Sequence, residues 1–263
     1  MSTLAGRRAL VTGSTGGLGL AIAQRLAQEG CAVLLHGLAT PEEAEPDRRA
    51  LEDCHGTAVR YRRADLARRN EVEALMRTAL ADGPLDILVN NAVVRHFGPV
   101  EALAPEHWDE DIAVNLTAAF LTTRLALPGM QARGYGRIVN ISSIYGLVGA
   151  TERAGYVTTK TAMIGLTRAV ALENAQRRGI TCNALCPGST LTPAIDQRIA
   201  ASMAANGVKD RAAAEAAFLA GKQPSRRFVE AERVAAMVAF LCGPGGEDIT
   251  GAAIPIDGGW SAA

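Results

Sequence analysis

The chain has 263 residues, of which 48% are hydrophobic, and its 27 basic and 27 acidic residues give a formal net charge of zero. A chain of this length and apolar content can fold as one α/β domain with a large core, and no linker, internal repeat or low-complexity run divides it. The balanced charge gives no electrostatic reason to bind nucleic acid or an anionic membrane. No apolar run approaches the ~20 residues that span a membrane, and we expect no signal peptide.

Short apolar runs alternate with helical patterns along the sequence. This alternation predicts a single α/β domain over residues 1–263, with one doubly wound, Rossmann-type parallel sheet of seven strands and helices on both faces. The segment 193–227 is alanine-rich and has no strand pattern, so we expect two short helices that form a lid over the substrate; the alternative is an ordinary surface hairpin. Strands are expected near 8–12, 31–36, 58–62, 85–90, 137–142, 180–186 and 251–256, and helices near 17–29, 42–54, 70–81, 106–132, 155–177 and 230–242.

The first predicted strand runs into a glycine-rich turn, Gly13, Gly17 and Gly19, and then into a helix. Strand, glycine turn and helix form the layout of a dinucleotide-binding unit. Glycine lets the backbone approach a pyrophosphate, and the helix N-terminus offers free N–H groups with partial positive charge. A tight strand–helix connection would use the same glycines, but the context favours a cofactor site.

Polar residues follow three later strands at the point where each strand ends. Asn91 closes the fourth predicted strand, Ser143 closes the fifth, and Gly188 follows the sixth. In an open parallel sheet, ligands bind at the carboxyl ends of the strands. We therefore expect these residues to share one site with the glycine turn.

Tyr156 and Lys160 are four residues apart in a predicted helix, so their side chains share one face. A phenol titrates near ~10 and is a poor base at neutral pH. A neighbouring cation favours the phenolate, and lowering the pKa to ~7 takes about 4 kcal/mol at ~1.4 kcal/mol per unit. Many helices carry such a pair by chance, but this one accompanies the cofactor motif, which favours a catalytic base.

The chain contains five cysteines, an odd number. Cys182 and Cys186 have CxxxC spacing, but an extended strand between them separates them too far for an easy disulfide. We expect reduced, buried thiols rather than a metal site, and hence a cytoplasmic protein.

Together these motifs resemble the short-chain dehydrogenase/reductase family over essentially the whole chain, and within it the bacterial D-3-hydroxybutyrate dehydrogenases. The resemblance implies an oxidoreductase that transfers a hydride between NAD and the secondary alcohol or ketone of a small 3-hydroxy or 3-oxo acid, working as a homotetramer. The matching residues are Thr12-Gly13-x3-Gly17-x-Gly19, Asp65-Leu66, Asn90-Asn91-Ala92, Asn115, Ser143, Tyr156-x3-Lys160 and Pro187-Gly188-x3-Thr192, with closer likeness in 122–130, 146–148, 180–184, 221–225 and 257–260.

The resemblance also implies four catalytic roles. Tyr156 exchanges the proton of the substrate hydroxyl, and Lys160 lowers its pKa and holds the nicotinamide ribose. Ser143 donates a hydrogen bond to the substrate oxygen, although Ser142 could compete with it. Asn115 fixes a water that links Lys160 to solvent; the alternative is that Asn115 only caps or kinks its helix.

Cofactor contacts follow from the same resemblance. Asp65 would accept from the adenine amino group, unless it only caps the next helix, and Asn91 would hold the adenosine ribose. The family usually has glycine where this chain has Val93, whose Cβ could press on the cofactor. The implied cofactor-binding residues are Gly13, Thr15, Gly17, Leu18, Gly19, Leu38, Asp65, Leu66, Asn91, Ala92, Tyr156, Lys160, Pro187, Gly188, Thr190 and Thr192.

The end of the second predicted strand, Gly37-Leu38, bears on the choice between NAD and NADP. NAD enzymes often place an acid there, and NADP enzymes place Arg or Lys to pair the extra phosphate. This chain has neither, and an added phosphate would be buried poorly paired. We expect NAD, with NADP less favoured.

The residues expected to bind the substrate differ from those of the hydroxybutyrate dehydrogenases. The hydroxybutyrate dehydrogenases hold a small carboxylate with two Gln, a His and a Lys, and the corresponding positions here are Arg95, Tyr145, Arg153 and Arg198, with His96 expected beside them. Guanidinium groups bind carboxylate, sulfonate or phosphate with two parallel hydrogen bonds. This favours a larger or more anionic hydroxy acid, such as a dicarboxylate or sulfonate, unless one or two arginines point into solvent.

Two other functions stay open: a 3-oxoacyl reductase, and a dinucleotide-binding regulator without turnover. Regulators of this fold typically lose the tyrosine or the lysine. Tyr156 and Lys160 are both present, which makes a regulator the weaker alternative.

Overall fold

The computed structural model describes residues 4–177, 179–191 and 193–263. Strands and helices alternate through most of it, as the hydrophobic pattern predicts. The elements are β1 (Arg8–Val11), α1 (Gly17–Gln28), β2 (Ala32–Gly37), α2 (Pro41–His55), β3 (Val59–Arg63), α3 (Arg69–Ala81), β4 (Ile87–Asn90), α4 (Pro105–Ile112), α5 (Ala118–Arg133), β5 (Gly136–Ile141), α6 (Ala154–Asn174), β6 (Ile180–Pro187), α7 (Pro193–Asn206), α8 (Arg211–Leu219), α9 (Ala231–Cys242) and β7 (Ala253–Ile256).

The strands form one parallel sheet in the order β3-β2-β1-β4-β5-β6-β7. Val11 at the end of β1 is in register with Leu35 of β2 on one side and with Val89 of β4 on the other. The order of strands reverses between β1 and β4, and ligands of doubly wound folds bind at such a switch point, at the carboxyl ends. The predicted Rossmann-type sheet of seven strands is confirmed.

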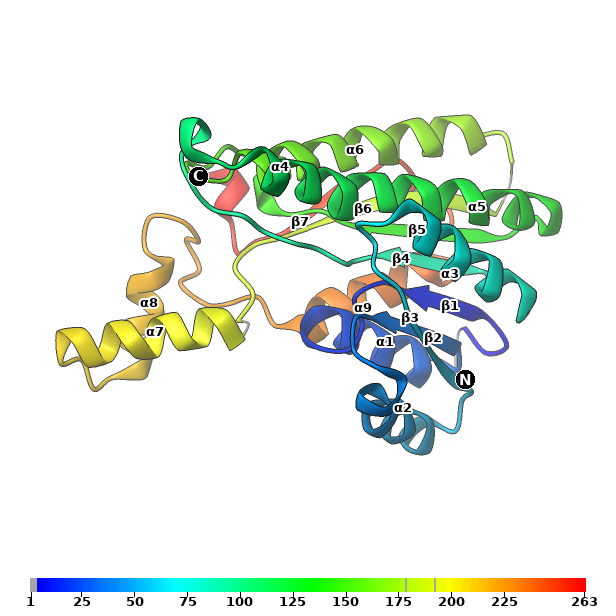
Figure 1. The fold of residues 1–263 in the computed structure, drawn as a ribbon, viewed down its shortest axis with the longest axis horizontal. Coiled ribbons are helices and arrows are strands. Elements are labelled where there is room, and N and C mark those ends of the chain that lie inside the picture. Colours follow the sequence, from blue (N-terminus) through cyan, green and yellow to red (C-terminus); the bar gives the residue numbers. More distant parts are fainter. Residues whose placement is uncertain (1–3, 178, 192) are drawn as a thin grey trace.

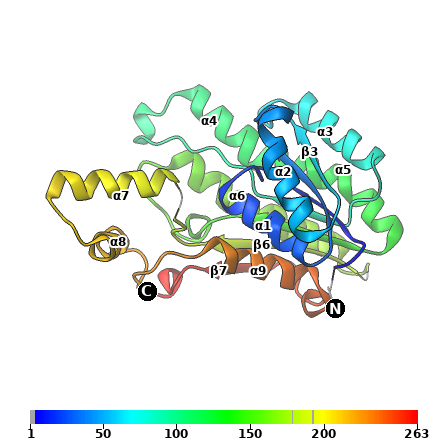
Figure 2. The ribbon, with the colours of Figure 1, turned by 90° about the horizontal axis from the view of Figure 1, so that it is seen from below.

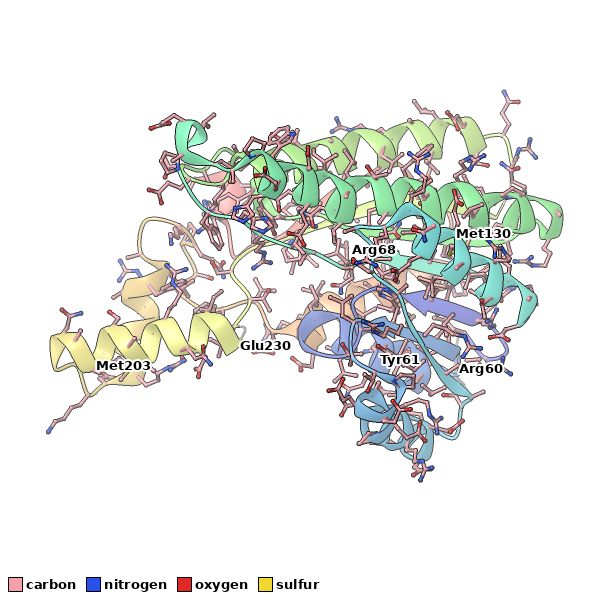
Figure 3. All side chains as sticks on the ribbon, viewed as in Figure 1. Arg60, Tyr61, Arg68, Met130, Met203 and Glu230 are labelled. Atoms are coloured by element: carbon pink, nitrogen blue, oxygen red, sulfur yellow. The ribbon has the colours of Figure 1, made fainter. Side chains whose placement is uncertain are left out.

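Helices cover both faces of the sheet (Figure 1). Along β1, Ala9 and Val11 face a core shared with α1, α2 and α9, whereas Leu10 faces the opposite core with α3, α5 and α6. Successive side chains of a strand point to opposite faces, which explains why inner strands such as β1 carry apolar residues toward both cores. Met130, labelled in Figure 3 on α5, is fully buried in the second core.

A π-helical turn at Ala113–Thr117 joins α4 to α5, so that the three together form one long helix. By length and composition, Pro105–Arg133 is long and apolar enough to cross a membrane. Here it packs as a core helix, because Ala126 and Met130 are buried against the sheet.

The segment after β6 contains the two short helices, α7 and α8, which project from the body of the molecule (Figures 1 and 2, yellow). Arg211 of α8 forms an ion pair of 2.6 Å with Asp196 of α7. Asp210 caps α8, its side chain accepting from the N–H groups of Ala212 and Ala213. The pair therefore leaves the sheet at the carboxyl end of β6, beside the switch-point edge.

Candidate active site

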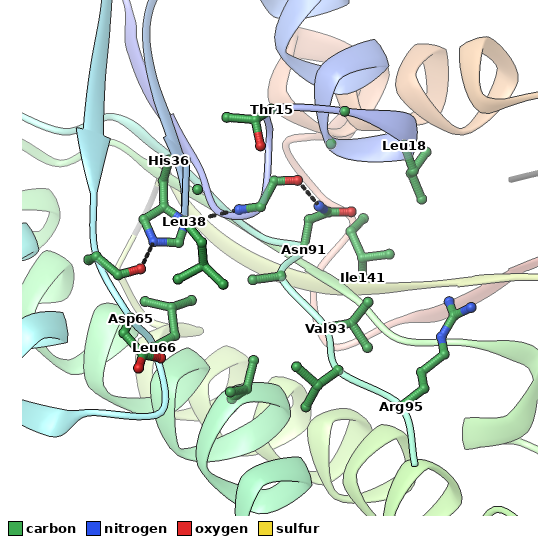
Figure 4. Close-up of a pocket in the computed structure, with 18 of the residues that line it drawn as sticks. Thr15, Leu18, His36, Leu38, Asp65, Leu66, Asn91, Val93, Arg95 and Ile141 are labelled. Carbon is green, nitrogen blue, oxygen red and sulfur yellow. Dashed lines mark hydrogen bonds between the residues drawn. The ribbon is translucent and has the colours of Figure 1, made fainter. Parts of the chain in front are cut away.

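The glycine turn between β1 and α1 is hydrogen-bonded to Asn91, which directly follows β4, the neighbour of β1 in the sheet. Gly13 has φ +61°, and a Cβ at Gly19 would come 2.1 Å from the Gly13 carbonyl oxygen, so both positions require glycine. Asn91 donates hydrogen bonds of 2.9 Å from its amide to the carbonyl of Thr12 and to that of Gly13; Figure 4 shows the bond to Gly13. The turn is thus held open for close approach by a ligand.

His36, at the end of β2, holds the same turn from the other side. Its Nδ1 accepts from the Gly13 N–H at 3.0 Å, and its Nε2 lies 3.0 Å from the Ala64 carbonyl (Figure 4). Burial lowers the pKa of His36 to about 4, although the bond to Ala64 acts in the opposite direction. The imidazole is therefore neutral near pH 7 with its proton on Nε2. No role was predicted for His36 from the sequence, where a polar residue in a buried strand was the only signal.

A cavity of about 710 Å³ opens over this turn at the carboxyl ends of the strands. We call it the larger cavity; its size lies within the roughly 300–1,000 Å³ of ligand sites. Gly17 lies at the start of α1 with φ +53° but does not line it. Of the residues predicted to bind cofactor, it is lined by Gly13, Thr15, Leu18, Gly19, Leu38, Asp65, Leu66, Asn91, Ala92, Tyr156 and Lys160.

The open glycine turn and the N-terminus of α1 fit a dinucleotide pyrophosphate. Leu38, 62% exposed, lines the β2 end of the larger cavity. Arg63, also exposed, donates from Nε to the Leu38 carbonyl at 2.9 Å. Arg95 lies across the cavity from Leu38 (Figure 4).

Several residues of the larger cavity have structural partners already. Asp65 accepts from the N–H of Ala67 at 3.0 Å and pairs with Arg68 at 3.3 Å, so it shapes the turn before α3 while lining the cavity. Val93, where the family has glycine, is 37% exposed and faces the cavity. Val93 thus lies where its side chain could contact a bound cofactor, and its effect on the cofactor stays a prediction.

Tyr156 and Lys160 lie on α6, and both are buried, 5% and 1% exposed. The Lys160 Nζ lies 5.7 Å from the Tyr156 ring centroid and donates to the Ile141 carbonyl at 2.7 Å. Burial is the largest influence on the Tyr156 pKa and raises it, but the charges of Arg95 and Lys160, with hydrogen bonds to Ser143 and Arg95, bring the pKa below its usual value. Burial lowers the pKa of Lys160, and the Tyr156 oxygen partly opposes this. The lowered pKa favours the Tyr156 phenolate, which is the form that can act as a base.

Ser142 and Ser143 have different surroundings. The Ser142 hydroxyl donates to the Lys160 carbonyl at 2.8 Å and ties β5 to α6. Ser143 forms a hydrogen bond with Tyr156, and its Oγ also accepts from the Tyr145 N–H at 3.1 Å. Ser143 is thus the serine next to the tyrosine hydroxyl.

Asn115 is fully buried in the π-helical turn. Its side-chain oxygen accepts from the Val94 N–H at 2.9 Å, and its amide donates to the Val94 carbonyl at 3.0 Å and to Thr159 at 3.4 Å. The irregular helix that the sequence left as an alternative is present, and the Asn115 side chain connects the segment after β4 to α6.

A smaller cavity of about 400 Å³ adjoins the larger one, and Tyr156 lines both. Gly188, Ser189 and Thr190 border it, whereas Thr192 lies outside the described residues. Of the residues predicted to bind substrate or cofactor, the smaller cavity is lined by Leu18, Arg95, Ser143, Tyr145, Arg153, Tyr156, Pro187, Gly188, Thr190 and Arg198.

His96 is the predicted substrate residue that the structure does not bring to either cavity. Its ring stacks on His107 at 4.1 Å, and its nitrogens lie 3.2 Å from carboxylate oxygens of Glu110 and Asp111. The chain is extended here, so successive side chains alternate, and His96 points away while Arg95 points into the site.

Several aromatic and basic residues of the smaller cavity were not predicted from the sequence. Tyr145 packs edge-on against Trp260, with ring centroids 5.3 Å apart. Phe97, Phe218, Lys222 and Trp260 also line the wall. They come from segments far apart in sequence, and only the likeness of 221–225 and 257–260 to the family gave a signal.

Comparison with known proteins places this site in a family. The family described as short chain dehydrogenase matches residues 7–202. The D-beta-hydroxybutyrate dehydrogenase of Cupriavidus necator is 42% identical over 260 residues, covering 98% of this chain and 99% of that protein. The protein of the same name from Rhizobium meliloti is 38% identical over 258 residues, covering 97% and 99%. The solved L-sorbose reductase from Gluconobacter frateurii, complexed with NADPH and L-sorbose, has a TM-score of 0.93 and 29% identity and covers 100% of both chains.

Proposed function

Because the chain belongs to the short chain dehydrogenase family, we propose that it oxidises a small 3-hydroxy acid, or reduces the corresponding 3-oxo acid, with NAD. One observation carries this proposal: Tyr156, with its pKa lowered, lines both cavities, so one phenol can meet a substrate in the smaller cavity and a nicotinamide in the larger. The similarity to hydroxybutyrate dehydrogenases supports the substrate class.

A bound nicotinamide dinucleotide would accept or supply the hydride. In the oxidation, the Tyr156 phenolate takes the proton of the substrate hydroxyl, and in the reduction it returns that proton to the oxygen. Ser143 donates a hydrogen bond to the same oxygen, where negative charge develops. Lys160 and Arg95 stabilise the phenolate through their charge.

We infer NAD rather than NADP from the β2 end of the larger cavity. Leu38 is apolar, and the basic side chains that line the described cavity, Arg95 and Lys160, belong to its catalytic part. A phosphate beside Leu38 would be poorly paired there. Arg63 is the basic residue next to this position, and its guanidinium is bonded to the Leu38 carbonyl. The related L-sorbose reductase was solved with NADPH, so the choice requires a direct comparison of the two cofactors.

We also propose a homotetramer in the cytoplasm. Pro255 in β7 is exposed, Ile254 and Ile256 are only half-buried, and Phe240 on the neighbouring α9 is 49% exposed. Such an apolar edge is typical of a subunit contact. Thiols that are buried and free in the described structure, such as Cys182, support the proposed cytoplasmic location. Light scattering at micromolar concentration tests the assembly, and a monomer mass would exclude it.

A substrate panel tests the function. Purified enzyme with NAD is offered 3-hydroxybutyrate, 2-hydroxybutyrate and 2-butanol, and the absorbance of NADH is followed. We expect turnover of the 3-hydroxy acid at a higher kcat/KM than of the other two. Binding of NADH without turnover of these acids or of a dicarboxylic hydroxy acid would show that the chain is a dinucleotide-binding regulator.

A further inference from the structure

Four cationic side chains line the smaller cavity: Arg95, Arg153, Arg198 and Lys222. Its described lining contains no aspartate or glutamate. A single carboxylate carries one charge and two oxygens, which one guanidinium can already bind with two hydrogen bonds. The cavity therefore holds more positive charge than a monocarboxylic acid requires.

These cations form two groups. Arg95 lies at the reacting end, with its Cζ 5.0 Å from the Tyr156 ring centroid. Lys222 and Arg198 lie on the same ring of the lid, Phe218, at 4.8 and 5.7 Å from its centroid. The second group, which we call the lid cations, is Lys222, Arg198 and Arg153.

Arg153 completes the lid cations from the start of α6. Its Cζ lies 4.6 Å from the Phe97 ring centroid and 5.3 Å from that of Tyr145. Burial lowers the pKa of Lys222, and the charges of Arg153 and Arg198 lower it further, so each arginine is close enough to repel the Lys222 ammonium. Aromatic faces support them without neutralising their charge.

No acidic residue within the described ranges neutralises the lid cations by an ion pair. The nearest carboxylate on α7 is Asp196, two residues from Arg198, and it pairs with Arg211 instead at 2.6 Å. By contrast, the exposed Arg233 pairs with Glu230 at 2.9 Å. An anion that enters the cavity would offset the mutual repulsion of these cations.

We propose that the substrate is a hydroxy acid with two anionic groups, one bound by Arg95 beside the reacting carbon and the other by Lys222 with Arg198 and Arg153. This inference rests on the proposed function, and it names the substrate class of the same site. The second group is a carboxylate or a sulfonate, both of which present planar or threefold oxygens to guanidinium and ammonium donors.

The test compares acids of one length with different charge. Wild-type enzyme and NAD are assayed with 3-hydroxyglutarate, its monomethyl ester and 3-hydroxy-4-sulfobutanoate, and kcat/KM is measured for each. We expect a dianion to exceed the ester by at least ~10-fold, the size expected for one charged hydrogen bond. The two dianions distinguish a carboxylate from a sulfonate at the lid cations.

Lys222→Gln tests the lid cations directly. We expect this change to reduce the ratio of kcat/KM for dianion over ester by ~10-fold or more. Lys209→Gln, a change in the exposed connection between α7 and α8 outside the cavity, is the matched control and should keep the wild-type ratio. A ratio within one preparation does not depend on the fraction of folded enzyme.

Three outcomes would overturn the inference. Equal kcat/KM for dianion and ester in the wild type would show that the second charge is not recognised. An equal loss for both acids in Lys222→Gln, or a weaker NADH affinity in that variant measured by fluorescence, would assign the lid cations to lid closure or to the cofactor. Turnover of none of the hydroxy acids would instead refute the proposed function on which the inference rests.

Discussion

Replacing His36 with Gln should make the stability of the protein less sensitive to pH. His36 is 2% exposed, and burial lowers its pKa from 6.5 to about 4. Between these two values the unfolded chain binds a proton that the folded chain does not. The contribution of His36 to stability is therefore present above pH 6.5 and is lost as the pH falls through this window.

The size of the effect follows from the same two values. Lowering the pH from ~7 to ~5 should reduce the free energy of unfolding by about 2 kcal/mol through His36 alone. Only near pH 4 and below would His36 be protonated in the folded chain, which would remove the acceptor of the Gly13 N–H and loosen the glycine turn. Gln can offer an oxygen to Gly13 and an amide to Ala64 without titrating.

The assay is urea unfolding of wild type and His36→Gln at both pH values, followed by circular dichroism at one protein concentration. We expect the wild type to lose about 2 kcal/mol more than the variant on acidification. The same pH dependence in both proteins would refute the reasoning and would show that His36 is protonated in the folded state without cost.

Three further predictions concern the site. With saturating substrate, NAD should exceed NADP in kcat/KM by at least ~10-fold because Leu38 offers no partner for the added phosphate, and equal efficiencies would show that Arg63 reaches it. Arg95→Gln removes a charge that lowers the Tyr156 pKa, so the rise of kcat/KM with pH in the oxidation should move to higher pH; an unmoved profile would contradict this. Arg153→Ala should lower kcat/KM for an anionic substrate, by a factor that corresponds to about 2–4 kcal/mol of transition-state stabilisation. A neutral ketone of equal size should lose less. Equal losses would make Arg153 a lid contact.

The fold and the polar end of the sheet could be predicted from the sequence because both depend on local patterns. Buried strands such as β4 are apolar runs in the sequence, and in a parallel sheet the carboxyl ends of the strands lie at one edge. Tyr156 and Lys160 were found because four residues along a helix place two side chains on one face. Their closeness to Ser143 then follows from the adjacent β5 and α6.

The other site residues could not be predicted, because their roles depend on where side chains point and on contacts between segments far apart in the sequence. His96 was expected in the substrate site, but the extended chain turns it toward Glu110. Lys222 and Trp260 reach the smaller cavity from the lid and the C-terminal tail, which only the folded chain brings together. His36 was overlooked because its role depends on a backbone N–H of Gly13.

The central claim is that Tyr156 exchanges the substrate proton, and Tyr156→Phe tests it most directly. The phenylalanine keeps the ring packed against Tyr145 and Lys160 but removes the titrating oxygen. We predict a fall in kcat of at least ~10³-fold, within the ~10²–10⁴ that general acid–base catalysis contributes, with NADH affinity retained by fluorescence titration. Near-wild-type turnover in this variant would contradict the account.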